Sequence, residues 1–240
     1  MKSRSAALGR LQSWNPEPGS ILTIKKANLK TDAPGNHAGS RGLSLWPAGL
    51  QAGKNRATLN SITGESEYTG MDQEQTLLLD ALLYEDGHQR RTEHILKVYG
   101  LARLLGEAEG LETEERMILQ AAAILHDIPI KYCKEHCGGD ACQENQRREA
   151  PRLVEAFLQQ AGYPAQCTPR VLELVERHHD YSGSHGRLLG LLMEADLLVN
   201  CYEDPPSPER LEKLAPLFRT EIGRRLLAAY RRGRSPRGDG

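Results

Sequence analysis

The chain has 240 residues and a formal net charge of −1, and 39% of its residues are hydrophobic. This length allows one domain with extensions or two small domains, and the mean hydropathy of −0.55 indicates that part of the chain lies outside a packed core. No apolar run reaches the roughly 18 residues of a membrane-spanning helix, and the basic N-terminus lacks the apolar segment of a secretory signal. We therefore expect a cytoplasmic protein without a membrane partner.

Residues 1–70 differ in composition from the rest of the chain. They hold nine Lys and Arg against four Asp and Glu, whereas the remainder has a net charge of −6. The segment is rich in Gly, Ser, Asn and Pro and lacks periodicity, so we predict a disordered basic N-terminal extension. Its cations are neither clustered nor interleaved with aromatic residues, and we expect no nucleic-acid partner. Because organised sequence begins at Met71, a true start near Met71 is a further hypothesis.

From Met71 onward the apolar residues recur at helical spacing, and no strand pattern of any strength appears. The spacing predicts helices that begin near residues 72, 88, 113, 143, 168, 187 and 218. We therefore expect residues 71–232 to form one all-α domain, followed by a frayed basic tail over residues 233–240.

The helix that begins near residue 113 ends in a His-Asp pair. His126 and Asp127 follow a run of small and apolar residues, and Pro129 then stops the helix from continuing normally. An ionised Asp beside the core is costly unless something neutralises it. A divalent metal does so, and neutral His with anionic Asp is a normal ligand mixture for Zn, Mn or Fe. For the dipeptide alone, ordinary capping hydrogen bonds are the more common explanation.

Three other helices also place an imidazole or a carboxylate in an apolar context. His94 lies beside the apolar stripe of its helix, His178 and His179 follow a helix, and Asp196 interrupts the run from Leu188 to Val199. One such His is usually a core histidine. Four helices that each supply such a group are what a metal site in a helical bundle requires.

The ordered pattern of His94, His126-Asp127, His178-His179 and Asp196 resembles the HD-domain metal-dependent phosphohydrolases. The resemblance covers about residues 88–203. It implies an HD-type helical bundle of about six to eight helices, with His94, His126, Asp127 and Asp196 as metal ligands. The metal is expected to be Mn, Zn, Fe, Mg or Co.

One departure from the family pattern concerns a second metal. Two-metal members usually carry another His near the start of the helix after the central motif, and residues 144–151 contain none. This puts a second, histidine-rich position in doubt. Glu149 could supply an oxygen ligand, and either His178 or His179 could complete the site. Adjacent helical residues point about 100° apart, so we expect one of the two to face the site and favour His178.

The resemblance implies a nucleotide or another small phosphate ester as substrate. Asp127 is expected to ligate the metal and to accept a proton from the attacking water. Lys131, just past the motif, is a second catalytic candidate because it could contact phosphate. Arg90 and Arg91, one turn before His94, are further candidates for binding substrate phosphate. A homodimer stays open.

Two other functions compete with hydrolysis. Some relatives of this fold hold two irons and are oxygenases, although the missing histidine near residue 146 argues against that reading. A non-catalytic metal- or nucleotide-binding regulatory module is the other, and a plain helical bundle with satisfied buried polar residues stays open.

The five cysteines are an odd number without a secretory context, so we expect free thiols. The cluster of Cys133, His136, Cys137 and Cys142 could bind structural zinc, but its spacing matches no closed zinc module, and we predict a loop with free thiols there.

Overall fold

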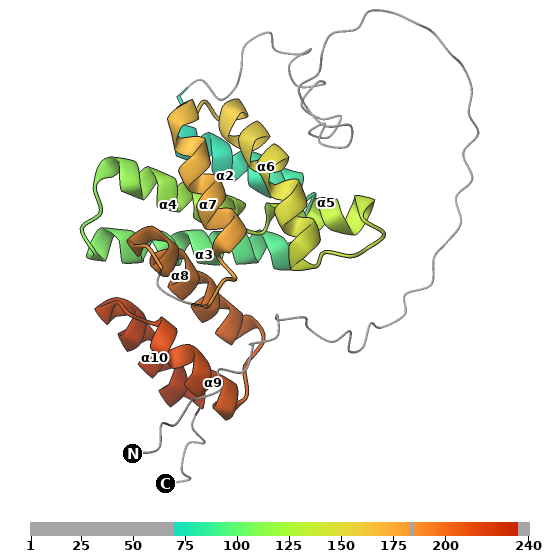
Figure 1. Ribbon diagram of the computed structural model, residues 1–240. Helices are drawn as coiled ribbons and strands as arrows, with labels where there is room; N and C mark the ends of the chain where they lie inside the picture. The colour runs from blue at the N-terminus through green and yellow to red at the C-terminus, as the bar shows by residue number, and fades with distance from the viewer. Residues whose placement is uncertain (1–69, 183–184, 235–240) are drawn as a thin grey trace, which may run out of the picture.

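The computed structural model describes residues 70–182 and 185–234 (Figure 1). These residues form helices and two short 3-10 turns and contain no strand, so the all-α prediction is confirmed for them. The helices are α2 (Gln73–Tyr84), α3 (Gln89–Ala108), α4 (Thr113–Leu125), α5 (Ile128–His136), α6 (Gln143–Gln160), α7 (Thr168–Arg177), α8 (Arg187–Glu203), α9 (Pro208–Leu214) and α10 (Glu221–Arg234). The predicted disordered extension and most of the tail lie outside the described residues.

Two helices were not expected from the sequence. The helix α5 begins directly after Asp127, with Pro129 in its first turn, where a missing N–H costs no helical hydrogen bond. The prediction of a loop over the cysteine cluster is therefore wrong for residues 128–136, which are helical and include the buried Cys133, whereas residues 137–142 form a connection without helix. The helix α9 begins at Pro208, after Ser207, whose side chain accepts a hydrogen bond from the Arg210 N–H.

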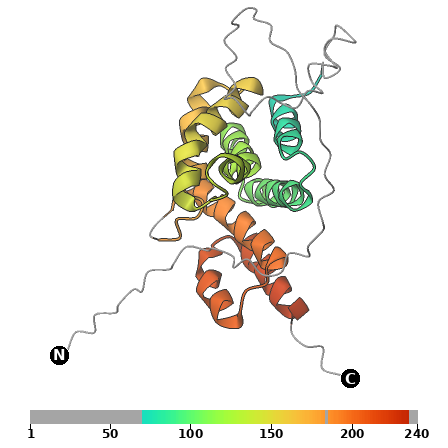
Figure 2. The ribbon, with the colours of Figure 1, turned by 90° about the vertical axis from the view of Figure 1, so that its right-hand side faces the viewer.

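The helix α4 is the centre of the main core. Every residue from Ile118 to Leu125 is buried, and α4 packs against α2, α3, α7 and α8 (Figures 1 and 2). This buried stretch reaches the C-terminal end of α4, so that end lies among other elements. The His-Asp pair at the C-terminal end of α4 is therefore surrounded by helices on several sides.

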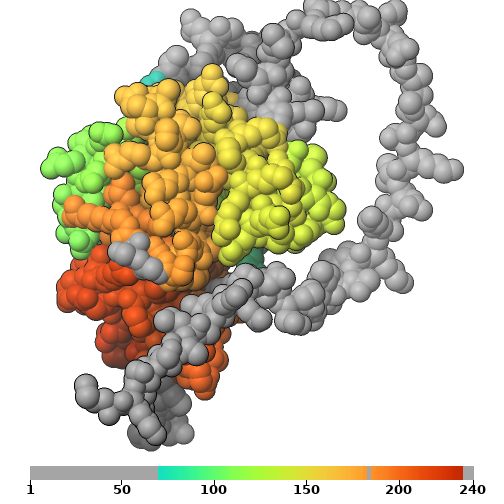
Figure 3. Space-filling model, viewed as in Figure 1, coloured from blue at the N-terminus to red at the C-terminus, as the bar shows by residue number. Residues whose placement is uncertain are grey.

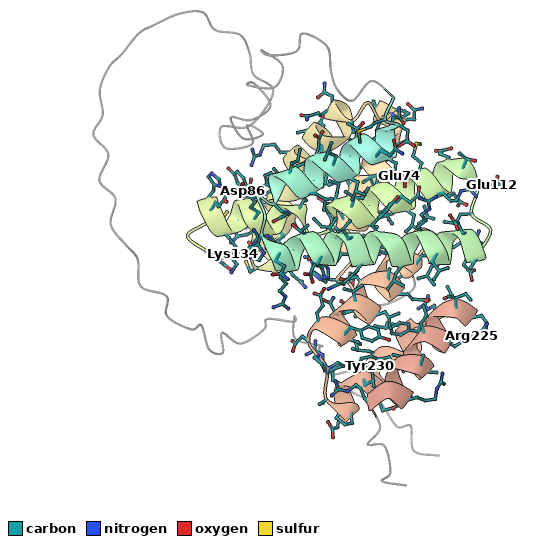
Figure 4. The ribbon with its side chains drawn as sticks, turned by 180° about the vertical axis from the view of Figure 1, so that it is seen from behind. Glu74, Asp86, Glu112, Lys134, Arg225 and Tyr230 are labelled. Atoms are coloured by element: carbon teal, nitrogen blue, oxygen red, sulfur yellow. The ribbon has the colours of Figure 1, made fainter. Side chains whose placement is uncertain are left out.

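The helix α8 connects the main core to a smaller layer. Its first half packs in the main core, whereas Leu197 and Cys201 pack with residues of the C-terminal layer, which contains α9 and α10. Tyr230 of α10 meets Tyr202 of α8 edge to face, with ring centroids 5.0 Å apart (Figure 4). In Figure 2, α8 runs from the upper bundle into this lower layer.

A buried carboxylate fixes α10 to α8. Glu194 accepts hydrogen bonds from the backbone N–H groups of Arg219 and Thr220, at 2.7 and 2.9 Å, and from the Thr220 hydroxyl at 2.6 Å. These are the donors just before the N-terminus of α10, where a negative charge is favourable. A Cβ atom at Gly223 would lie 1.9 Å from Glu194 Oε2, so only glycine leaves room for this carboxylate. None of the described helices has the length and apolarity needed to cross a membrane.

Candidate metal centre

His126 and Asp127 form the junction between α4 and α5. His126 still has helical backbone angles, whereas Asp127 has φ −105° and ψ 4° and begins the next helix as its N-cap. The helix thus ends at the pair, as the sequence predicted. His126 is 1% exposed, and the break directs both side chains toward α3 and α8.

Four side chains predicted to act together converge at this junction. The Nε2 atom of His94 lies 3.0 Å from Nε2 of His126, 3.3 Å from Oδ1 of Asp196 and 3.6 Å from Oδ2 of Asp127. His126 Nε2 lies 3.7 Å from the same oxygens of Asp127 and Asp196. The atoms are contributed by α3, the α4–α5 junction and α8.

The other ring nitrogens determine which atoms face the centre. Each Nδ1 atom of three histidines contacts an oxygen that only accepts hydrogen bonds, so Nδ1 carries the hydrogen and Nε2 presents a lone pair. The contacts join His126 to Ala123 O at 2.8 Å, His178 to Val175 O at 2.6 Å, and His94 to Glu203 Oε2 at 3.1 Å. Anchoring of this kind is typical of histidines that ligate metals.

The Nε2 lone pairs and the carboxylate oxygens at this junction face one another without a cation between them. Two Nε2 lone pairs 3.0 Å apart, on His94 and His126, cannot hydrogen-bond to each other unless one gains a proton. Asp127 Oδ1 and Asp196 Oδ2 are buried and have no hydrogen-bond partner among the described residues. Buried polar atoms without partners are costly. The donor set therefore fits a divalent cation.

The pKa values of the four residues show where the positive charge lies when no metal is bound. Burial lowers the pKa of His94, but the hydrogen bonds to Asp196 and Glu203 outweigh it and raise the pKa to about 10. Burial lowers the pKa of His126, which stays neutral. Burial would raise the pKa of Asp127, but the imidazoles of His126, His178 and His94 hold it well below its usual range. A proton on His94 thus supplies the cation when no metal is bound.

A second group of ligand atoms shares Asp127 with the first. Atoms of Asp127, His178 and His179 lie within 4.8 Å of one another, as do atoms of His94, His126 and Asp127. The expectation that only one of His178 and His179 faces the site is wrong. The two rings lie against each other, with centroids 3.8 Å apart, and both belong to this group. The pKa of His179 is lowered to about 4 by burial and by His178, so its imidazole is neutral.

The remaining predicted residues lie outside both groups. Lys131 contacts Glu135 at 2.7 Å, and Arg91 contacts the buried Glu85. Glu149 contacts Arg148 at 3.2 Å and Arg152 at 3.1 Å. Arg90 lines an open groove together with Lys97 and Glu203, on the Glu203 side of His94. Three of these four charged side chains are therefore already engaged by nearby partners of opposite charge.

Sequence reasoning missed two polar residues that support the centre from α8. Asn200 donates a hydrogen bond to Asp196 Oδ1 at 2.8 Å, and Glu203 accepts from His94. These positions follow Asp196 by four and seven residues, which places all three on one face of the helix. That spacing is the signal that could have identified them.

The cysteine cluster does not form a metal site in the described residues. All five cysteines are free, and neither group of converging ligand atoms in this part of the chain includes Cys133, His136, Cys137 or Cys142. The expectation of free thiols is confirmed.

Comparison with protein families agrees with this geometry. The family model for the HD domain matches residues 91–211, a range that includes His94, the His-Asp pair and Asp196. Comparisons with curated proteins and with solved structures give no match. The matched range covers just over half of the chain, and the protein belongs to the HD-domain family.

Proposed function

We propose that this protein is a metal-dependent phosphohydrolase that acts on a nucleotide or another small phosphate ester. The observation that supports this most is the group of Nε2 lone pairs and partnerless carboxylate oxygens at the α4–α5 junction. Members of the HD-domain family are typically hydrolases of this kind. His94, His126, Asp127 and Asp196 would hold the cation, and Asp127, His178 and His179 offer a second position.

The two carboxylates would have different roles because their exposure differs. The side chain of Asp196 is 2% exposed and is held by Asn200, whereas that of Asp127 is 22% exposed. Asp196 would hold the cation, and Asp127 could also meet water that enters with the substrate. Bound here, a divalent cation would provide hydroxide near neutral pH and offset negative charge on the phosphoryl group.

Proton transfer would pass through Asp127 and His178. Asp127 would accept a proton from the attacking water, and its buried Oδ1 is the oxygen that faces His178. His178 Nε2 lies 3.6 Å from that oxygen, and its Nδ1–H is held by Val175 O. Burial lowers the pKa of His178, but Asp127 outweighs burial and raises it. His178 can therefore hold the transferred proton at Nε2.

The test compares metal content and phosphate release in the wild type and in Asp196→Asn. This change keeps the side-chain shape and removes the buried charge, so we expect loss of stoichiometric metal and of metal-dependent phosphate release. Asp86→Asn is the matched control, because Asp86 is exposed, belongs to neither group of converging ligand atoms, and has a φ of 51° that Asn tolerates (Figure 4). Full metal binding and activity in Asp196→Asn would refute the assignment.

A di-iron oxygenase is the second candidate. Residues 144–151 contain no histidine that could bind a second ion, but the group of Asp127, His178 and His179 offers ligands for one. Iron as the preferred metal, oxygen consumption and no phosphate release from any ester would favour this function over hydrolysis.

A further inference from the structure

A narrow groove between α6 and α7 borders the candidate centre. The two helices pack against each other, and their surfaces adjoin in Figure 3. The imidazoles of His126, His178 and His179 line it, and all three belong to the two candidate metal groups. By contrast, the open groove beside Arg90 contains no side chain from either group. Of these two grooves, only the one between α6 and α7 is lined by side chains of the candidate metal groups.

One face of α6 forms the opposite wall of this groove. Gln143, Gln146, Arg147 and Ala150 line it, at the spacing of one helical face. Gln146 already donates a hydrogen bond to Ala141 O at 2.7 Å, which fixes its amide. Arg147 is exposed and is the cation on this wall.

The charge of Arg147 is not compensated by an ion pair. Within the described residues, its guanidinium makes one long hydrogen bond, at 3.4 Å, to the neutral Gln143 Oε1, and has no carboxylate within 4.0 Å. The neighbouring Arg148 and Arg152 both pair with Glu149. Arg91 and Lys131 pair with their own acids, as described above. Arg147 is thus a cation on the groove that reaches the histidines, and it has no anionic partner in the part of the chain that the structure describes.

A single acid faces the same groove from α7. Glu176 lines it beside His178 and His179, and it limits how much negative charge the groove attracts. A phosphate group is a suitable anionic partner for Arg147, because a guanidinium binds two phosphate oxygens with a planar fork of donors. The other oxygens would face the imidazoles.

We propose that Arg147 is the phosphate-binding residue of the centre and that the substrate is a phosphate monoester whose terminal phosphate enters between α6 and α7. This inference rests on the proposed function, because it places the phosphate on the same cation. It replaces neither Arg90 nor the metal ligands. It adds a residue from the stretch 144–151, where the family's usual histidine is missing.

The test measures binding of inorganic phosphate by calorimetry to the full-length, metal-reconstituted protein. Arg147→Gln should weaken phosphate binding by about tenfold or more, the effect of losing a charged bidentate contact, with metal content and melting temperature unchanged. Arg148→Gln is the matched control, since Arg148 is adjacent but paired with Glu149, and it should change binding by less than about twofold. Glu176→Gln should tighten binding.

Equal phosphate binding by the wild type and Arg147→Gln would overturn the proposal, and so would a metal-loaded wild type that binds no phosphate. Parallel losses in Arg147→Gln and Arg148→Gln would overturn it as well, because a nonspecific charge effect would then explain both. Failure of the proposed function is separable: phosphate binding that depends on Arg147 in a protein that hydrolyses no ester would support Arg147 and refute hydrolysis.

Discussion

Glu203 should control the metal affinity of the centre although it is not expected to touch the metal. Its Oε2 accepts the hydrogen bond from His94 Nδ1 at 3.1 Å, and its Oε1 accepts from Lys97 at 3.0 Å. The contact holds the tautomer in which His94 Nε2 faces Asp196 and His126. Glu203→Ala would leave Nδ1 without its acceptor and let the ring reorient.

The magnitude follows from this geometry. Loss of a carboxylate that orients a metal-ligating histidine typically costs 10- to 100-fold in affinity, or about 1.4 to 2.8 kcal/mol. The contact is well enclosed, because the side chain of Glu203 is 11% exposed, so we expect the upper part of this range for Glu203→Ala. Glu203→Gln keeps an oxygen that can accept the hydrogen bond from His94 Nδ1–H, so its metal affinity should fall less. Metal affinity should therefore decrease in the order wild type, Glu203→Gln, Glu203→Ala.

The assay is competition with a fluorescent chelator at fixed pH, using the full-length protein. Glu93→Gln is the matched control, since Glu93 also contacts Lys97, at 3.2 Å, but is 46% exposed, and its carboxylate makes no hydrogen bond or ion pair with the His94 ring in the described structure. Its metal affinity should be unchanged. An unchanged affinity in Glu203→Ala, or an equal loss in Glu93→Gln, would refute the reasoning.

Two further predictions concern pH and packing. Metal must displace the proton of His94, whose pKa is raised from 6.5 to about 10, so the apparent metal affinity should rise with pH by up to about tenfold per unit between these values. The same proton on His94 stabilises the metal-free fold below pH 6.5, and this contribution to stability should fade as pH rises through about 10. Chelator competition at several pH values measures the metal affinity, and urea unfolding at the same pH values measures the stability. Profiles that do not change with pH would contradict the two expectations. Gly223→Ala should destabilise the fold by about 1 to 3 kcal/mol, because its methyl group would displace Glu194 from the donors before α10. Urea unfolding measures this loss of stability. Gly233→Ala is the control, because Gly233 lies in the same helix and no atom beyond its own helix backbone and chain neighbours lies within 4 Å of the added Cβ. Equal stability of the two variants would contradict the expectation.

The sequence alone determined the helices with long apolar stripes and the candidate ligands that interrupt those stripes. The run from Ile118 to Leu125 predicts a buried helix, and Pro129 predicts a break at His126-Asp127, because both effects act within a few residues. Asp196 could be recognised for a similar reason, since a carboxylate inside an apolar run requires a partner. The short helix α5 was missed because Pro129 was interpreted only as a break, although it lies in the first turn of that helix. The helix α9 has only seven residues, too few for a clear apolar period.

Only the tertiary structure decided which charged groups meet. Glu203 contacts His94 across 109 positions of sequence, and no local pattern specifies that pairing. Ligand atoms of both His178 and His179 lie within 4.8 Å of an Asp127 oxygen, and the two rings lie against each other at the end of α7. Lys131 and Arg91 were plausible phosphate ligands by position, yet each is engaged by an acid within six residues, whereas Arg147 faces the groove without such a partner. Burial of single side chains follows from local periodicity, but the pairing of charges depends on how distant helices pack, and helix packing is a property of the whole fold.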